Sequence, residues 1–108
     1  MNNEMQNLYE TVMERKENPE EGSYTAYLFS KGEDKILKKV GEECTEVIIA
    51  SLSQSREELI GEFGDLLYHL CVLMAEKGIS YSEVEAELEK RSKKKHNLKA
   101  ERRPIENL

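Results

Sequence analysis

Five acidic residues stand in two short clusters whose spacing suits metal-dependent chemistry. The first cluster holds Glu42, Glu43 and Glu46, and the second holds Glu62 and Asp65. Glu46 and Glu62 are equally far from Gln54 along the chain. The same holds for Glu43 and Asp65. Two antiparallel helices that turn near Gln54 would place these acids at matching heights, because each helix advances about 1.5 Å per residue.

These acids stand among apolar residues, which makes them costly to bury without a partner. From Ile60 to Met74 nearly all the remaining side chains are apolar or small. This segment is therefore expected to be buried nearly all round. Several carboxylates cannot neutralise one another, whereas a hard divalent cation can, and Mg²⁺ that keeps some waters suits carboxylates best. The alternative is that the acids form an ordinary solvated helix face.

The segments that must position these acids have the pattern of helices. Lys35 to Ala50 and Gly61 to Met74 repeat apolar residues at helical spacing, and the polar stretch Ser51 to Ser55 separates them. The acids of the first segment fall within roughly 100° of arc on a helical wheel. Ser55 and Glu58 have the spacing of a capping box that starts the second segment. We therefore predict an all-α helical bundle built on a central antiparallel helical hairpin.

Three shorter segments complete the predicted fold. A first helix runs from about Gln6 to Glu17, a short one spans Tyr24 to Ser30, and a last one follows Ser80 to about Arg91 or Lys95. The 108 residues suffice for one domain that buries about two-thirds of its surface. Residues 97–108 have no helical period, and we expect them to form a mobile or docking tail.

The composition argues against several classes of protein. The net charge of −6 argues against nucleic-acid binding. No signal peptide is visible, and the apolar runs are far shorter than the roughly 18 residues of a membrane span, so no membrane partner is expected. Cys44 and Cys71 lie in apolar helical patterns without a CxxC spacing. They are expected to be reduced core thiols of a cytoplasmic protein.

Basic and aromatic residues near the acids could bind an anionic substrate. Lys35 and Lys39 share the helix side of the first acids and could reach an anion beside the metal. Ordinary pairing of Lys39 with the acids one turn later is the alternative. Tyr24 and Thr25 would line a substrate edge by stacking on a base and by hydroxyl contacts to phosphate. Tyr24 could also serve only as a core or dimer contact.

Two further features have two readings each. His69 sits one turn beyond Asp65, either as a hydrogen-bonded core group or as a ligand or base. The basic run from Lys90 to His96 is either a solvated helix end that complements the helix dipole or a surface that lies over a polyphosphate.

Four stretches of the chain resemble one known family. They are Ser-Tyr-Thr-Ala-Tyr-Leu-Phe (23–29), Lys-Gly-Glu-Asp-Lys-Ile-Leu-Lys-Lys-Val-Gly-Glu-Glu (31–43), Glu-Val-Ile-Ile-Ala (46–50) and Asp-Leu-Leu-Tyr-His-Leu (65–70). This pattern is similar to that of phosphoribosyl-ATP pyrophosphatases, in the all-α NTP pyrophosphatase superfamily. The acidic pattern alone marks the superfamily, whereas the Ser-Tyr-Thr and Lys-Ile-Leu-Lys-Lys-Val-Gly stretches mark the family. The resemblance runs from about Leu8 to Arg91.

The resemblance implies an activity and an assembly. It implies Mg²⁺-dependent hydrolysis of the α–β phosphoanhydride of phosphoribosyl-ATP to phosphoribosyl-AMP and pyrophosphate, the second step of histidine biosynthesis. It also implies a homodimer of helical subunits. No Cys- or His-rich segment flanks the domain in this sequence, so no fused cyclohydrolase is expected.

The resemblance also implies roles for single residues. The family's acidic metal motif matches Glu42, Glu43, Glu46, Glu62 and Asp65, and its neighbouring basic position matches Lys39. One acid not fully engaged with metal would orient the attacking water. Glu43 and Glu46 are the candidates, and Glu43 is preferred for its place at the edge of the acidic arc.

Two other functions compete with this interpretation. One is a house-cleaning pyrophosphatase that acts on free or damaged nucleotides. The other is a non-catalytic helical interaction module whose acids are only a solvated face. A dimer is expected, because the apolar second helix needs more covering surface than one small subunit supplies.

Overall fold

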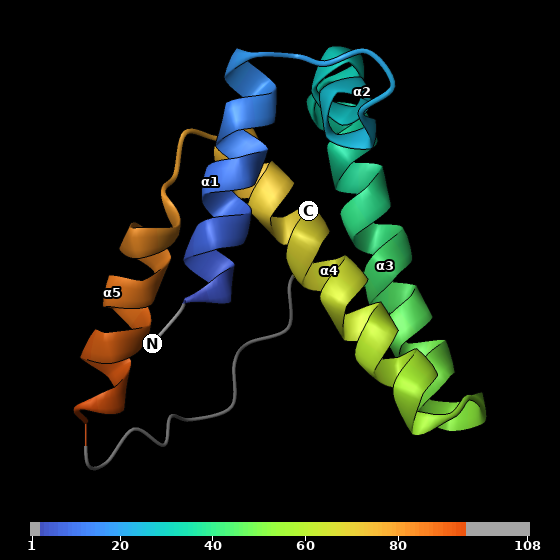
Figure 1. The fold of residues 1–108 in the computed structure, drawn as a ribbon. Coiled ribbons are helices and arrows are strands. Elements are labelled where there is room, and N and C mark those ends of the chain that lie inside the picture. The colour runs from blue at the N-terminus through green and yellow to red at the C-terminus, as the bar shows by residue number, and fades with distance from the viewer. Residues whose placement is uncertain (1–2, 95–108) are drawn as a thin grey trace, which may run out of the picture.

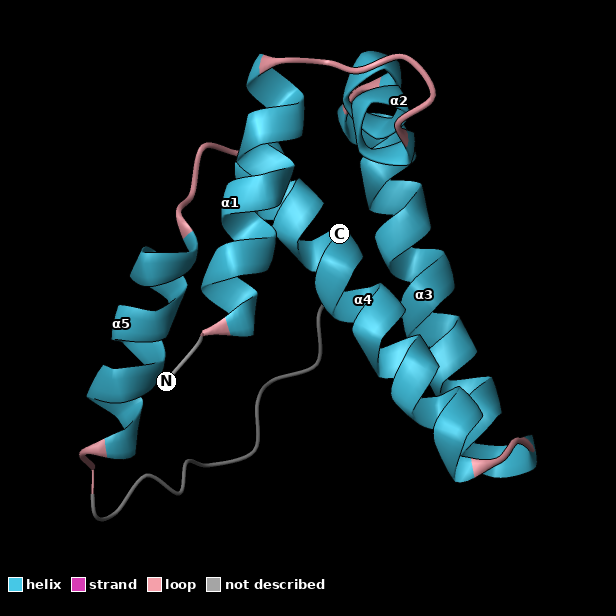
Figure 2. Cartoon of the chain, viewed as in Figure 1, coloured by secondary structure: helices cyan, strands magenta, loops and turns pink. Residues whose placement is uncertain are grey.

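The computed structural model describes residues 3–94, and every regular element among them is a helix (Figures 1 and 2). The helices are α1 (Glu4–Glu17), α2 (Tyr24–Lys31), α3 (Glu33–Ser53), α4 (Arg56–Glu76) and α5 (Tyr81–Ser92). The all-α prediction is therefore confirmed for this part of the chain. None of these helices combines the length and the apolar character that a bilayer crossing needs. The predicted tail, residues 97–108, lies outside the described residues.

The two longest helices, α3 and α4, pack along each other (Figure 1). They carry the five acidic residues of the predicted metal site. Each has 21 residues, and only Gln54 and Ser55 separate them. The predicted break from Ser51 to Ser55 is too long, because α3 continues through Ser53. The hydroxyls of Ser51 and Ser53 each donate to the carbonyl four residues earlier, at 2.9 Å. This bonding satisfies both hydroxyls inside the helix.

Side-chain caps fix where α4 and α5 begin. The hydroxyl of Ser55 accepts a hydrogen bond from the N–H of Glu58, and Ser80 accepts one from Glu83, both at 3.2 Å. The Glu83 carboxylate also accepts from the Ser80 N–H (2.8 Å), which completes a capping box. At α4 the Glu58 carboxylate accepts from the Ser55 hydroxyl instead (3.3 Å), so the predicted box forms there only in half. Caps of this kind typically contribute about 1 kcal/mol each.

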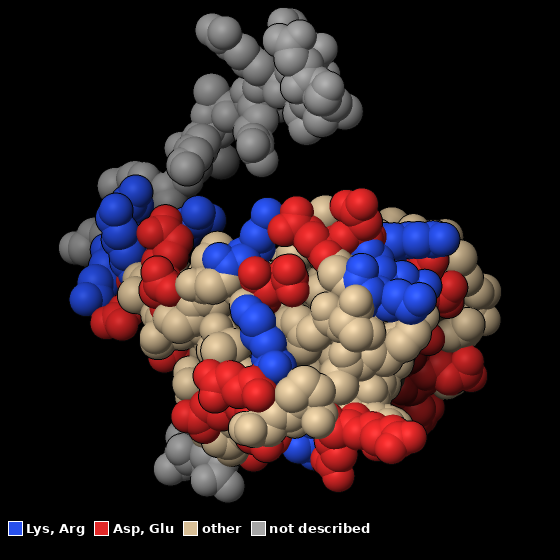
Figure 3. Space-filling model, turned by 90° about the horizontal axis from the view of Figure 1, so that it is seen from above, with Lys and Arg blue, Asp and Glu red and all other residues tan. Residues whose placement is uncertain are grey.

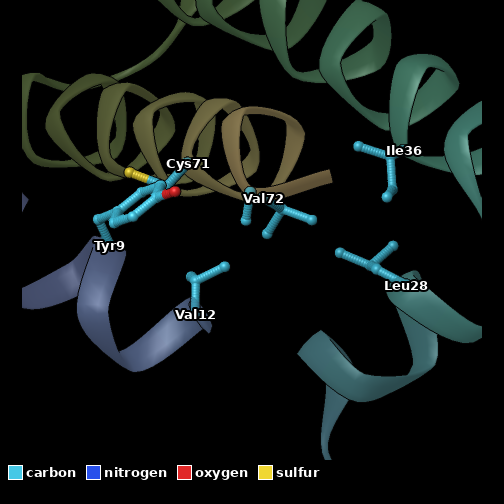
Figure 4. Close-up of a cluster of buried hydrophobic side chains, with 7 residues drawn as sticks. Tyr9, Val12, Leu28, Ile36, Cys71 and Val72 are labelled. Atoms are coloured by element: carbon cyan, nitrogen blue, oxygen red, sulfur yellow. The ribbon is translucent and has the colours of Figure 1, made fainter. Parts of the chain in front are cut away.

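The hydrophobic core lies where α1 and α2 meet the C-terminal half of α4 and the start of α3 (Figure 4). Its buried members come from these four helices: Tyr9, Val12, Leu28, Ile36, Cys71, Val72 and Ala75. Two polar groups of α1 seal this end of the molecule. The Tyr9 hydroxyl donates to the Ile79 carbonyl (2.8 Å), and the Lys16 ammonium donates to the Ala75 carbonyl (2.7 Å). The second bond caps the last turn of α4, whose carbonyls have no partner within the helix.

The other half of the α3–α4 pair leaves apolar side chains exposed. Ile60 and Phe63 of α4 are 59% and 48% exposed, and Leu52 of α3 is 84% exposed. The expectation that α4 is buried all round is therefore wrong for the single chain, because α1 and α2 cover only the core end. Cys44, expected to be a core thiol, is exposed for the same reason, whereas Cys71 is buried.

We expect Leu28→Ala to destabilise the fold by about 2–5 kcal/mol, because it empties a fully buried position in the core. Leu88→Ala is the matched control, since Leu88 is 56% exposed on α5. It should change the free energy of unfolding by less than about 1 kcal/mol. Urea denaturation followed by circular dichroism measures both values. Equal losses in the two variants would contradict this placement of the core.

Candidate active site

Three carboxylates from α3 and α4 converge at one place, and we call them the acid cluster. Glu43 of α3 and Glu62 and Asp65 of α4 each offer a carboxylate oxygen, and these oxygens all lie within 4.8 Å of one another. Glu43 and Glu62 are partly buried, and Asp65 is exposed. The packing of α3 along α4 produces the convergence, because it brings residues equally far from the turn to the same level.

The pKa of the Glu62 carboxyl is raised above its ordinary value. Burial is the largest cause, and the negative charges of Asp65, Glu46, Glu43 and Glu58 add to it in that order. Glu46 therefore lies close enough to act on Glu62, although it is not one of the three converging carboxylates. Like charges held together in this way favour the uptake of a proton or of a cation.

Lys39 brings positive charge to the α3 side of the acid cluster. Its ammonium lies 3.2 Å from an oxygen of Glu42 and 3.6 Å from an oxygen of Glu43. The hydrogen bond between Lys39 and Glu42 is the largest cause of the raised pKa of Lys39 and of the lowered pKa of Glu42. The charge of Lys35, one turn earlier, also lowers the pKa of Glu42. The helix pairing considered above therefore forms, and it still leaves the Lys39 ammonium beside Glu43.

The acid cluster has the donor set of a hard divalent cation. All three groups are carboxylates, which Mg²⁺ prefers to nitrogen or sulfur ligands. Two ligands on opposite sides of one Mg²⁺ lie about 4.2 Å apart, so a spread of 4.8 Å is close to that of ligands on one shared ion. The residues therefore fit a magnesium ion. Glu42 and Glu46 lie next to them, in the pairings just described, but outside the converging set.

An aromatic row lies beside these charges and joins α2 to α4. The Tyr24 ring stacks with the rings of Tyr27 and Tyr68, at centroid distances of 6.2 and 6.1 Å. The Thr25 hydroxyl is hydrogen-bonded to the Tyr68 hydroxyl. The Tyr24 hydroxyl lies 3.0 Å from Nε2 of His69. These contacts place both predicted substrate residues of α2, Tyr24 and Thr25, against α4.

Tyr24 also lies close to the charged groups of the site. Burial raises the pKa of its hydroxyl most strongly, the Lys39 ammonium lowers it, and Glu43 and Glu42 raise it. Tyr24 as a whole is nevertheless 45% exposed, so it presents surface to a ligand. The structure thus brings Tyr24, Lys39 and the acid cluster into one neighbourhood.

Sequence reasoning did not identify Tyr68 and His69 as the partners of α2. His69 is 5% exposed, and its Nδ1 lies 2.7 Å from the Asp65 carbonyl oxygen. It is therefore a hydrogen-bonded buried group, which is one of its two predicted roles. The position of His69 one turn beyond Asp65 was the feature of the sequence that could have indicated this hydrogen bond. The sequence could not show that Tyr24 would lie across from it, because that depends on how α2 packs.

Two residues in the described part of the basic run pair with acids one turn earlier. Arg91 lies 3.1 Å from Glu87, and Lys93 lies 3.4 Å from Glu89. These pairs agree with the interpretation of a solvated helix end. Residues 95 and 96 lie outside the described part of the chain. On the face seen in Figure 3, acidic and basic side chains are interspersed.

Comparisons with known proteins point to one family. A family model described as Phosphoribosyl-ATP pyrophosphohydrolase matches residues 5–92, which include the whole acid cluster. The chain is similar to a phosphoribosyl-ATP pyrophosphatase of Clostridium acetobutylicum, with 58% identity over 94% of this chain and 92% of the relative. A protein of the same name from Bacillus thuringiensis is 56% identical over 100% of both chains. Another from Listeria welshimeri is 62% identical over 83% of this chain and 86% of its own.

Glu62→Gln should stabilise the metal-free protein at neutral pH and lose that advantage in acid. A raised pKa means that the folded state binds the Glu62 proton more tightly than the unfolded chain does. Ionisation of Glu62 therefore opposes folding, fully above its folded-state pKa and not at all below the unfolded value of about 4.3. Thermal melts in EDTA, from about pH 3.5 to about pH 8, measure the difference in Tm.

Glu57→Gln is the matched control for this experiment. Glu57 lies on the same helix but outside the acid cluster, so its replacement should give no gain in Tm at neutral pH. If Glu62→Gln melts at or below the Tm of the unaltered protein at every pH, the repulsion inferred for the acid cluster is absent.

Proposed function

The chain belongs to the phosphoribosyl-ATP pyrophosphohydrolase family and is a hydrolase, and from this premise we propose its reaction and its metal. It hydrolyses phosphoribosyl-ATP to phosphoribosyl-AMP and pyrophosphate, with Mg²⁺ as cofactor. The observation that carries the proposal is the convergence of Glu43, Glu62 and Asp65 within the matched residues 5–92.

The setting of the reaction is part of the same proposal. Hydrolysis of this substrate places the enzyme in histidine biosynthesis, as the resemblance implies. A cytoplasmic location is proposed because Cys44 and Cys71 are both free thiols, which reducing compartments maintain.

The acid cluster would hold the metal, with Glu42 and Glu46 as further candidate ligands. Mg²⁺ bound there supplies neutralisation of the polyphosphate charge and polarisation of the anhydride. The protein's own part is to keep the carboxylates together at this spacing. Burial raises the pKa of Glu62 most strongly, and the negative charge of Asp65 raises it further, so a cation bound at this place would be stabilised.

The cationic and aromatic residues supply the substrate side of the site. The Lys39 ammonium stands 3.6 Å from Glu43, so it can bind phosphate oxygens beside the metal. Lys35, one turn earlier on α3, extends this positive charge. Tyr24 and Thr25 border the site from α2, and the exposed part of the Tyr24 ring is a surface on which a base can stack.

Hydrolysis also needs a group that takes a proton from the attacking water. The water oxygen bonds to the α-phosphorus of the α–β anhydride, the bridging oxygen leaves with pyrophosphate, and the proton passes to a carboxylate. Glu43 belongs to the acid cluster and also pairs with Lys39. Glu46 lies outside the cluster but near Glu62. We therefore favour Glu46 for this role instead of Glu43, which the sequence favoured, and this role replaces that of a further metal ligand for Glu46.

We also propose a homodimer in which α3 and α4 form the central hairpin of a helical bundle. The apolar patch that would form the interface comprises exposed residues of these two helices: Ile48, Ile49, Leu52, Ile60, Phe63 and Leu67. Large apolar side chains that are exposed on two neighbouring helices favour an association surface. Gly61 and Gly64 lie in the same stretch of α4, and a Cβ added at either would meet nothing within 4 Å in this chain. A helix of a second copy could therefore approach closely there.

Purified protein should release pyrophosphate from phosphoribosyl-ATP in Mg²⁺ and stop when EDTA removes the metal. Asp65→Asn should lower kcat/KM by about 100-fold or more, because it removes a carboxylate of the acid cluster. Glu57→Gln, outside the cluster, should stay close to the unaltered enzyme. Undiminished pyrophosphate release in EDTA would contradict the proposed dependence on Mg²⁺. A higher kcat/KM on dUTP or dCTP than on phosphoribosyl-ATP would contradict the proposed substrate and favour a house-cleaning pyrophosphatase.

Phe63→Glu should convert the dimer to monomers, because it places a charge among the apolar residues proposed to be buried on association. Leu88→Glu is the control: Leu88 is 56% exposed on α5 and does not belong to the patch. Sedimentation equilibrium over a range of concentrations measures both. An unaltered protein that is monomeric throughout, or a Phe63→Glu dimer of equal affinity, would contradict the proposed interface.

A further inference from the structure

The contacts of His69 determine which of its ring nitrogens carries a hydrogen. Nδ1 lies 2.7 Å from the carbonyl oxygen of Asp65, one turn earlier on α4. A carbonyl oxygen can only accept a hydrogen bond, so Nδ1 must be the donor. His69 is 5% exposed, and both of its hydrogen-bond partners, this carbonyl and the Tyr24 hydroxyl, are uncharged. The neutral ring is the form that needs no buried countercharge at this position.

The tautomer of His69 sets the direction of the bond to Tyr24. A neutral imidazole with a hydrogen on Nδ1 has a bare Nε2, which is an acceptor. The Tyr24 hydroxyl lies 3.0 Å from Nε2 and must therefore donate its only hydrogen to His69. What the Tyr24 oxygen then presents to its other neighbours is lone pairs alone.

The site side of Tyr24 is where these lone pairs matter. Tyr24 is 45% exposed, and the Lys39 ammonium and the Glu43 and Glu42 carboxylates are near enough to act on its hydroxyl. A phosphate oxygen is itself an acceptor, so it gains nothing from an oxygen that has no hydrogen to give. A hydroxyl or an N–H is the complementary partner.

We infer that His69 is a positioning residue that holds Tyr24 as a hydrogen-bond acceptor, so that Tyr24 receives a ribose hydroxyl or a base N–H of the substrate and not a phosphate oxygen. The inference rests on the proposed function. It replaces the expectation that the Tyr24 hydroxyl contacts phosphate. Phosphate binding is then left to the lysines and the metal, and Tyr24 acts in recognition of the nucleoside part.

The bond between Tyr24 and His69 is not needed to attach α2 to the rest of the fold. Thr25 and Tyr68 make a separate hydrogen bond between α2 and α4. Leu28 of α2 is fully buried in the core. Loss of the Tyr24 hydroxyl should therefore leave the helix in place and remove only the polarity that it presents to the substrate.

Steady-state kinetics of Tyr24→Phe tests the inference. KM for phosphoribosyl-ATP should rise about threefold to tenfold, the usual value of one hydrogen bond, with kcat within about twofold. Inhibition by pyrophosphate, which has neither ribose nor base, should be unchanged. Tyr81→Phe, which removes a phenol on α5 far from the acids along the chain, is the matched control and should behave as the unaltered enzyme. Weaker inhibition by pyrophosphate in Tyr24→Phe would show a phosphate contact and overturn the inference.

Two replacements of His69 separate its two contacts. His69→Asn keeps a donor near the Asp65 carbonyl but is too short to reach Tyr24, and it should reproduce the KM of Tyr24→Phe. His69→Gln places an oxygen near the Nε2 position and should restore KM toward the unaltered value. Combining His69→Asn with Tyr24→Phe should add nothing further. If Gln and Asn give the same KM at equal Tm, His69 does not act through Tyr24.

Nitrogen-15 NMR of the histidine side chains tests the tautomer without any assay of activity. His69 Nδ1 should show the shift of a protonated ring nitrogen and Nε2 that of a bare one. The opposite pattern would overturn the inference even in an active enzyme. Failure of the unaltered protein to hydrolyse phosphoribosyl-ATP would instead count against the proposed function, and the nitrogen pattern would still decide the polarity of the Tyr24 bond.

Discussion

The approach of like charges across two packed helices is the constraint on which this structure depends. Glu43, Glu62 and Asp65 bring their oxygens within 4.8 Å of one another. Such a cluster opposes the packing of α3 on α4 unless something else holds the helices together. The apolar core next to the cluster contributes to this, because Leu28, Ile36 and Val72 of α2, α3 and α4 are buried together there.

The helix α2 connects these two regions. On one side it places Leu28 in the core, and on the other it places Tyr24 beside Lys39 and the acids. Its attachment to α4 combines stacked rings with two side-chain hydrogen bonds, from Thr25 to Tyr68 and from Tyr24 to His69. Residues far apart in the sequence thus lie beside one another because the 8 residues of α2 contact both the core and the acidic part of the molecule.

The part of this site that depends on spacing was predictable from the sequence. Glu43 and Asp65 are equally far from the turn, and helical rise alone places them at one level. Helix starts at Ser55 and Ser80 followed in the same way from local capping chemistry. These features depend on residues a few positions apart or on the constant rise per residue of two antiparallel helices.

The parts that depend on packing were not predictable. Glu42 and Glu43 differ by one position, which is about 100° around the helix. Glu43 belongs to the acid cluster, whereas Glu42 lies outside it and is hydrogen-bonded to Lys39. Cys44 has an apolar neighbourhood in the sequence but is exposed, because α1 and α2 do not reach it. The partnership of Tyr24 with His69 required knowledge of where α2 lies.

The sealed core and the open apolar patch occupy opposite ends of the same two helices, and this has a consequence for how the protein matures. A newly synthesised chain can complete its core from its own α1, α2 and α4 without waiting for another molecule. The proposed pairing of two subunits would then be a second, concentration-dependent event between chains whose core is already complete. Formation of the core would be unimolecular, and only the covering of the exposed apolar side chains would depend on a second molecule.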